Sequence, residues 1–246
     1  MPDNIMSREP DSNQARTDAD ANRIEKARIR DAYARRTPHH DSYAAAIRPS
    51  REMIFRRHIQ SNGLPSMDRL SLLEVGCGTG AEMKRMLELG VRPENLTGIE
   101  LLEDRFESAR AALPDACSVI LGDAATVDLP DRCFDVVFAC TVFTSILEED
   151  VRRRLAGNMW RMVAPGGGVL VYDFIWNNPR NPDVRGVSRA ELAMLFPDTA
   201  GTYDRVTLAP PIGRPLARWA PGLISPLEKI PILRSHLIAW FRKAPA

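Results

Sequence analysis

Residues 72–80 read Leu72-Leu73-Glu74-Val75-Gly76-Cys77-Gly78-Thr79-Gly80, an apolar run that passes into three glycines at alternate positions. Helix-forming residues follow over 81–89. The pattern predicts a strand, a tight turn and the start of a helix. Glycine adopts positive φ and lets a ligand approach the backbone, and the unpaired N–H groups of a first helical turn favour a polar or anionic group. We therefore expect a nucleotide-like ligand over Gly76–Gly80.

Two other interpretations of this turn stay open. Gly76, Gly78 and Ala81 also fit the G-x-G-x-x-G/A fingerprint of dinucleotide-binding proteins, and Glu100 lies about twenty residues further on, where such proteins carry a ribose-binding acid. That interpretation predicts an NAD-dependent Rossmann-fold reductase, although the chain holds no Tyr-x-x-x-Lys dyad. The other alternative is a glycine-rich turn that binds no ligand.

The order of further motifs resembles that of class I S-adenosylmethionine-dependent methyltransferases, over residues 70–175. The family carries an acid before three alternating glycines, an acid that ends the second strand, an Asp after the third, an apolar fourth strand, and Leu/Ala-Pro-Gly-Gly before the fifth. The matching residues are, in that order, Glu74 with Gly76, Gly78 and Gly80; Glu100; Asp123; Phe134–Phe138; and Ala164-Pro165-Gly166-Gly167. Five landmarks in order and at similar spacings make the resemblance specific.

The resemblance implies S-adenosyl-L-methionine as the cofactor and gives a role to each landmark. Glu100 would accept both ribose hydroxyls, Asp123 would accept from the adenine amino group, and the glycine turn would hold the amino-acid end. For Glu100 and Asp123 the alternative is a purely structural role in capping a helix or a turn. The residues expected to bind the cofactor are Tyr33, Glu74, Gly76, Cys77, Gly78, Thr79, Gly80, Glu100, Leu101, Asp123, Ala124 and Cys140.

The sequence indicates the catalytic residues less clearly than the cofactor-binding residues. Many relatives carry an acid and then a His after the fourth strand, where this chain has Thr141 and Ser145, so the resemblance gives no support for His-based proton transfer there. Asp173, which closes the expected fifth strand, is the best candidate for a catalytic base, with Asn177 near it. A buried Asp173 that only orders the following loop is the alternative. The chain also lacks the Asn/Asp-Pro-Pro-aromatic stretch that marks methylation of nucleic-acid amines.

The fold that this pattern predicts is α/β, a doubly wound and mostly parallel seven-stranded sheet with an antiparallel edge strand. Near-continuously apolar strands alternate with helices, as expected when both faces of a parallel sheet are covered. The expected strands are Leu70–Val75, Leu96–Glu100, Ser118–Leu121, Phe134–Cys140, Val169–Phe174, Arg205–Leu208 and His236–Phe241. Two helices precede them, the second expected over 50–62, and in this family such helices cover the cofactor.

We therefore divide the chain into a disordered tail over 1–20, a helical lid over 21–66 and a methyltransferase domain over 67–246. The domain contains a proline-rich segment, residues 209–235, which we expect to be a packed irregular loop because prolines interrupt helices. Its surroundings are basic: residues 206–246 hold six Arg or Lys and one Glu, a net charge of +5. Peripheral contact with a membrane or an anionic substrate is the alternative role.

The amino-acid composition is typical of an ordinary globular protein. The 246 residues are 44% hydrophobic with a formal charge of +1, which gives no bulk attraction to nucleic acid. No apolar run is long enough to span a membrane, and we expect no signal peptide in the first 22 residues, which are polar. The four cysteines lack C-x-x-C spacing, so we expect reduced thiols, no metal site and a cytoplasmic location.

The leading hypothesis is an enzyme that methylates a small-molecule or glycan acceptor, at oxygen. The tail and the loop over residues 177–182 resemble a group of bacterial methyltransferases associated with polysaccharide biosynthesis, a resemblance that says nothing direct about the acceptor. The alternatives are the NAD-dependent reductase and a non-catalytic partner protein that binds S-adenosylmethionine. The sequence indicates neither the acceptor atom nor the oligomeric state.

Overall fold

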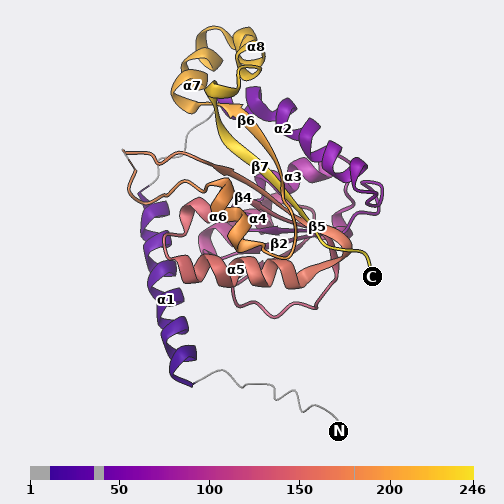
Figure 1. The fold of residues 1–246 in the computed structure, drawn as a ribbon, viewed down its shortest axis with the longest axis vertical. Coiled ribbons are helices and arrows are strands. Elements are labelled where there is room, and N and C mark those ends of the chain that lie inside the picture. The colour runs from indigo at the N-terminus through magenta and orange to yellow at the C-terminus, as the bar shows by residue number, and fades with distance from the viewer. Residues whose placement is uncertain (1–11, 36–41, 180) are drawn as a thin grey trace.

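The computed structural model of the protein describes residues 12–35, 42–179 and 181–246 (Figure 1). The helices are α1 Ser12–Ala34, α2 Ser42–Ser61, α3 Ala81–Glu88, α4 Glu103–Ala112, α5 Glu149–Met162, α6 Arg189–Leu195, α7 Pro210–Trp219 and α8 Ile224–Glu228. The strands are β1 Leu72–Val75, β2 Leu96–Glu100, β3 Ser118–Leu121, β4 Phe134–Cys140, β5 Val163–Phe174, β6 Thr202–Leu208 and β7 Arg234–Arg242.

The strands form one seven-stranded sheet in the order β3-β2-β1-β4-β5-β7-β6. The first five in this order pair in parallel, and β7 joins β5 and β6 in antiparallel register. The expected doubly wound, mostly parallel sheet with an antiparallel edge is confirmed. The strand order reverses at β1 and β4, and ligands of such sheets bind at the carboxyl ends of the strands that flank this switch point.

Helices cover both faces of the sheet, so its inner strands are largely buried (Figure 1). One core contains Phe55 of α2 with Met83 and Met86 of α3. The other contains Leu155 and Met159 of α5 and continues into α6. Burial on both faces explains why the strands are apolar without alternation, and it fixes the carboxyl edge of the sheet as a rigid platform.

The N-terminal helices are longer than the sequence predicted. Helix α1 begins at Ser12, inside the stretch expected to be disordered, because neither proline nor glycine interrupts the chain from there to Ala34. Helix α2 begins at Ser42 and continues through Pro49, where a start near residue 50 was expected. Its first turns bury Tyr43 and Ile47, and this packing outweighs the break that Pro49 would otherwise cause. Residues 1–11 and 36–41 lie outside the described residues.

The proline-rich segment is helical, so the expectation of an irregular loop was wrong. It forms α7, a short 3-10 helix over Pro221–Leu223, and α8. Pro210 begins α7 and Pro221 begins the 3-10 helix, at positions where a missing N–H removes no hydrogen bond. Ile224 and Leu208 of β6 pack with Tyr43 of α2 in a small core of their own. The segment therefore docks on α2 and β6, at one end of the molecule (Figure 1).

Candidate functional site

The glycine turn and the end of β2 are joined by hydrogen bonds to one carboxylate. The N–H of Gly78 donates to Glu100 Oε2 at 2.8 Å, and the N–H of Leu102 donates to Oε1 at 2.9 Å. Gly78 has φ +59, and a Cβ there would lie 2.5 Å from Nη2 of Arg105. Both the backbone conformation and the space therefore favour glycine at this position.

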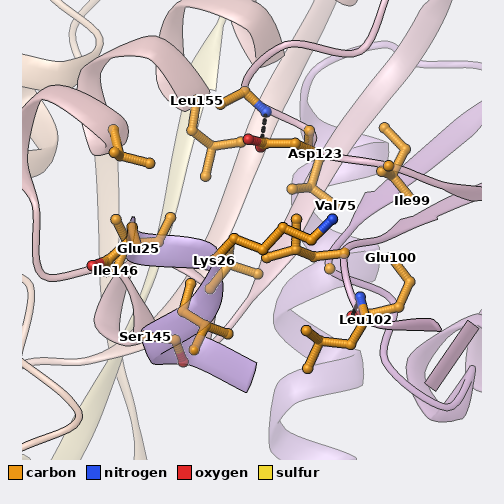
Figure 2. Close-up of a pocket in the computed structure, with 18 of the residues that line it drawn as sticks. Glu25, Lys26, Val75, Ile99, Glu100, Leu102, Asp123, Ser145, Ile146 and Leu155 are labelled. Atoms are coloured by element: carbon orange, nitrogen blue, oxygen red, sulfur yellow. Dashed lines mark hydrogen bonds between the residues drawn. The ribbon is translucent and has the colours of Figure 1, made fainter. Parts of the chain in front are cut away.

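A cleft of about 770 Å³, part of it open to solvent, lies at the carboxyl ends of β1, β2 and β4. Helix α1 forms its other side, and Figure 2 shows Lys26 of α1 reaching across the cleft toward the strand ends that carry Glu100 and Asp123. The structure brings together these expected residues on its wall: Tyr33, Gly76, Glu100, Leu101, Asp123, Ala124 and Cys140. The expected residues that do not line it are Glu74, Cys77, Gly78, Thr79, Gly80, Asp173 and Asn177.

Asp123 caps the turn after β3, which is the structural role that the sequence offered as the alternative to ligand binding. Its Oδ1 accepts a hydrogen bond from the N–H of Ala125 at 2.9 Å, which holds the turn after β3. The side chain remains partly exposed on the cleft wall, beside Ala124. A carboxylate accepts through two oxygens and several lone pairs, so this bond leaves Asp123 able to accept from a ligand as well.

Glu74 lies beneath the glycine turn with 1% of its surface exposed. Burial raises the pKa of its carboxyl well above the usual range, and the nearby Glu82 adds to the effect. Within the part of the chain that the structure describes, Oε2 of Glu74 has no hydrogen-bond partner. An unpartnered buried carboxyl oxygen is unfavourable, so a cationic or hydrogen-bond-donating group beside it would be stabilising.

Arg51 of α2 was not predicted as part of this region. Its guanidinium lies 3.9 Å from the centre of the Tyr172 ring, and its Nη2 is 3.1 Å from Glu82 Oε1 and 3.5 Å from Cys140 Sγ. Cys140 lines the cleft, so Arg51 brings a positive charge directly behind the cleft wall. No sequence signal indicated this residue, because it lies 89 positions before Cys140.

Asp173 and Asn177 support loops and do not reach the cleft. The carboxylate of Asp173 accepts from the N–H of Thr144 at 3.2 Å and from its hydroxyl. Burial raises the pKa of Asp173 to about 7. Asn177 Oδ1 accepts from the N–H of Gly186 at 2.8 Å. In the structure Asp173 positions Thr144, whose neighbour Ser145 lines the cleft, and Asn177 positions the loop before α6. A catalytic role for either residue stays a prediction.

Helix α1 is fastened over the cleft by two charged residues that the sequence did not single out. Glu25 is 3% exposed, and its Oε1 accepts from the N–H of Leu147 at 2.6 Å and from Arg28 at 2.7 Å. Arg28 also donates to the carbonyl oxygens of Ser145 and of Asp183, the latter at 3.1 Å. Further along α1, the Tyr33 ring lies 4.4 Å from the Arg105 guanidinium. The helix thus contacts both rims of the cleft.

Comparisons with known proteins agree with this geometry. Residues 72–167 match the family model described as a methyltransferase domain. These residues form a methyltransferase domain of the class I S-adenosylmethionine-dependent type. The matched residues run from the start of β1 to the turn within β5 and contain every landmark from Glu74 to Gly167. The family match supports S-adenosylmethionine over NAD as the ligand of the glycine turn.

Two curated relatives illustrate the likeness in sequence. The chain is 31% identical over 157 residues to a dTDP-4-amino-2,3,4,6-tetradeoxy-D-glucose N,N-dimethyltransferase of Saccharopolyspora spinosa, covering 58% of this chain and 60% of that one. It is 29% identical over 147 residues to a malonyl-[acyl-carrier protein] O-methyltransferase of Serratia marcescens, covering 60% of this chain and 52% of that one. Sterol C-methyltransferases also match, at lower identity. The chain spans no more than 60% of the length of these relatives.

The fold is shared with the N-methyltransferase NodS of Bradyrhizobium japonicum WM9. The two structures superpose with a TM-score of 0.59 at 17% identity, over 81% of this chain and 97% of NodS. At that identity the likeness concerns the fold alone. At 81% of this chain, the superposed part is longer than the matched residues 72–167.

The residues present fit the family's cofactor. Glu100 offers a carboxylate for a diol, Asp123 a second acceptor for an amino group, and Glu74 an oxygen without a partner among the described residues. These are the groups that a nucleoside with a cationic amino-acid end requires. A phosphorylated ligand would bring negative charge to the carboxylates of Glu100 and Asp123, which is unfavourable.

Proposed function

We propose that the protein is an S-adenosylmethionine-dependent methyltransferase that transfers a methyl group to an oxygen of a small-molecule or glycan acceptor. The observation that carries this proposal is the cleft in which Glu100 and Asp123 stand on adjacent strand ends beneath α1. The four cysteines are free thiols, which supports a cytoplasmic location.

In this proposal the protein binds the cofactor and the acceptor, orients them and excludes water. S-adenosylmethionine supplies a methyl group already activated on a sulfonium, so the residues of the chain need not activate a leaving group. Glu100 and Asp123 fix the nucleoside, and Cys140 and the turn at Gly76 border the region where the acceptor must arrive. Holding two reactants in line is itself a large source of rate. Helix α1 then acts as the lid that keeps water out.

The acceptor atom is the finer part of the proposal. The named relatives methylate nitrogen, oxygen or carbon, so they do not assign the acceptor atom. The carboxylates that line the cleft are engaged in this proposal: Glu25 by Arg28 and Leu147, Glu100 by two backbone N–H groups and the ribose, and Asp123 by the N–H of Ala125 and the adenine amino group. None of the three is then left to act as a general base toward the acceptor. This arrangement favours an acceptor oxygen that ionises easily, such as a carboxylate or an acidic hydroxyl, over an unactivated alcohol.

Methyl transfer can be tested directly with S-adenosylmethionine labelled in the methyl group. The purified chain is incubated with fractionated cell extracts, sugar nucleotides and acyl thioesters, and label is followed into products by mass spectrometry. We expect label in a carboxyl or acidic hydroxyl group of a small molecule or glycan. Label at nitrogen or carbon would refute the oxygen assignment. Tight binding of S-adenosylhomocysteine without turnover on any acceptor would instead support the non-catalytic partner protein.

A further inference from the structure

The proline-rich segment exposes an unusual concentration of large apolar side chains. Of the ten exposed large hydrophobic residues among those the structure describes, five lie within residues 209–235. Trp219 and Ile232 are 77% and 81% exposed. The five residues are Ile212, Trp219, Leu223, Ile230 and Ile232. Single exposed apolar residues need no explanation, but a local concentration indicates an interaction surface.

The charges of the same segment are positive and face outward. Arg214, Arg218 and Lys229 are exposed. The only acid in residues 209–235 is Glu228, which is buried and accepts from the N–H of Leu208 at 3.2 Å. The exposed surface of the segment therefore combines aromatic and aliphatic side chains with cations, and no exposed carboxylate lies among them.

The fold presents these side chains on a rigid projection. Ile224 packs on Tyr43 and Ile47, and the hydroxyl of Tyr43 donates to the carbonyl oxygen of Leu208. Figure 1 shows α7 and α8 together at one end of the molecule, beyond the sheet. Ile212 and Trp219 are seven residues apart in α7 and so share one face of that helix. Little conformational entropy remains to be lost when such a surface binds.

We infer that the proline-rich segment is a docking surface for an anionic lipid bilayer. Tryptophan and aliphatic side chains insert at the boundary between headgroups and acyl chains, and Arg and Lys beside them are attracted to anionic headgroups. A second copy of the chain would bring the same cations against each other, which is unfavourable. No helix among the described residues has the length and apolarity to cross a bilayer, so the contact is peripheral. The inference rests on this surface and is independent of the proposed methyl transfer.

Vesicle co-sedimentation tests the inference with the full chain. The vesicles are phosphatidylcholine alone, or phosphatidylcholine with about one third phosphatidylglycerol. The apolar test variant is Trp219→Ser with Ile232→Ser, and its matched control is Met194→Ser, which changes a residue that is 73% exposed on α6. The charge test variant is Arg218→Glu with Lys229→Glu, and its matched control is Lys84→Glu with Arg110→Glu, two exposed cations on α3 and α4. Unchanged circular dichroism confirms that each variant is folded.

The wild type should bind the anionic vesicles and not the neutral ones, and added salt should weaken the binding. Each basic residue near an anionic surface contributes about fivefold to the partition coefficient, so the charge test variant should bind more than ~20-fold more weakly. The apolar test variant should lose on the order of tenfold or more. Both controls should bind within about twofold of wild type, as expected for residues outside the surface.

Two results would overturn the inference. One is a wild type that stays in the supernatant with anionic vesicles at low salt, or test variants that bind as well as their controls. The other is a concentration-dependent dimer, seen by analytical ultracentrifugation, that Trp219→Ser dissociates while vesicles have no effect. That second result would assign the surface to self-association.

Discussion

The amide of Gly78 and the carboxylate of Glu100 form a 2.8 Å hydrogen bond across 22 residues of sequence. This bond ties the glycine turn after β1 to the end of β2 at the switch point of the sheet. The same carboxylate also binds the N–H of Leu102, so Glu100 both builds the cleft and faces into it. A change at this residue should therefore affect the site more than the remote fold.

Glu100→Gln should weaken S-adenosylhomocysteine binding by on the order of ten- to a hundred-fold. A charged acceptor contributes roughly 1.5–3 kcal/mol to such hydrogen bonds, and the amide keeps the shape while removing the charge. Isothermal titration calorimetry measures the affinity, with Glu103→Gln, an exposed acid at the start of α4, as the control. Equal affinities for wild type and Glu100→Gln would remove Glu100 from the ribose site.

Gly78→Val should abolish cofactor binding and leave most of the fold intact. A β-branched residue is strained at φ +59, and its Cβ would displace Arg105 from the cleft wall. Gly157→Val is the control, because Gly157 lies within α5 and has no atom within 4 Å of its Cβ position. Circular dichroism and calorimetry separate folding from binding. If Gly78→Val binds like wild type, the ligand does not lie at this turn.

Asp173 should confer a pH-dependent stability on the protein. Its pKa is about 7 in the fold and about 4 when unfolded, so the folded state binds the proton more tightly. The stabilisation is complete below about pH 4 and is lost as the pH rises through about 7. Asp173→Asn lacks this titration, so the stability of wild type relative to the variant should fall between about pH 5 and about pH 8. Urea titrations of wild type and Asp173→Asn at the two pH values measure this difference in the free energy of unfolding.

The same variant distinguishes a positioning role from a catalytic one. The amide that Asp173→Asn introduces is unable to take up a proton but can still hydrogen-bond Thr144, so we expect this variant to keep kcat within a few-fold of wild type. Asp173→Ala should lower stability and raise KM, because Thr144 loses its partner. A loss of kcat in Asp173→Asn of about a thousandfold or more, with KM unchanged, would restore Asp173 as the catalytic base.

Arg28→Ala should loosen the lid that α1 provides. Arg28 joins Glu25 to the carbonyl oxygens of Ser145 and Asp183, so its loss frees α1 from the rim formed by the loops after β4 and β5. We expect hydrogen exchange in α1 to speed up and cofactor affinity to fall by roughly a few-fold to tenfold. Arg30→Ala, an exposed neighbour paired only locally with Asp31, is the control. Unaltered exchange in Arg28→Ala would mean that α1 is not a lid.

The sequence predicted the features that depend on neighbouring residues. The turn at Gly76–Gly80 and the acids at Glu100 and Asp123 follow strands, and strand ends in a parallel sheet share one edge. Their spacing therefore sufficed to place Glu100 and Asp123 in one cleft. The family resemblance predicted the cofactor. The order of the strands in the structure confirmed the predicted sheet.

The features that depend on distant contacts were missed. Glu25 meets Leu147 across 122 residues and Arg51 meets Cys140 across 89, and no local pattern indicates such pairs. The proline-rich segment was predicted to be irregular because prolines interrupt helices. In the structure, however, Pro210 and Pro221 each begin a helix and break none. Asp173 was placed correctly at the end of β5, but its hydrogen bonds to Thr144, 29 residues away, have no local signal in the sequence.

The central claim is that the cleft binds S-adenosylmethionine, and calorimetric titration of the full chain with S-adenosylhomocysteine and, separately, with NADH tests it most directly. We expect one site per chain for S-adenosylhomocysteine, lost in Gly78→Val, and no heat of binding for NADH. Binding of NADH in place of S-adenosylhomocysteine, with the same dependence on Gly78, would contradict the claim.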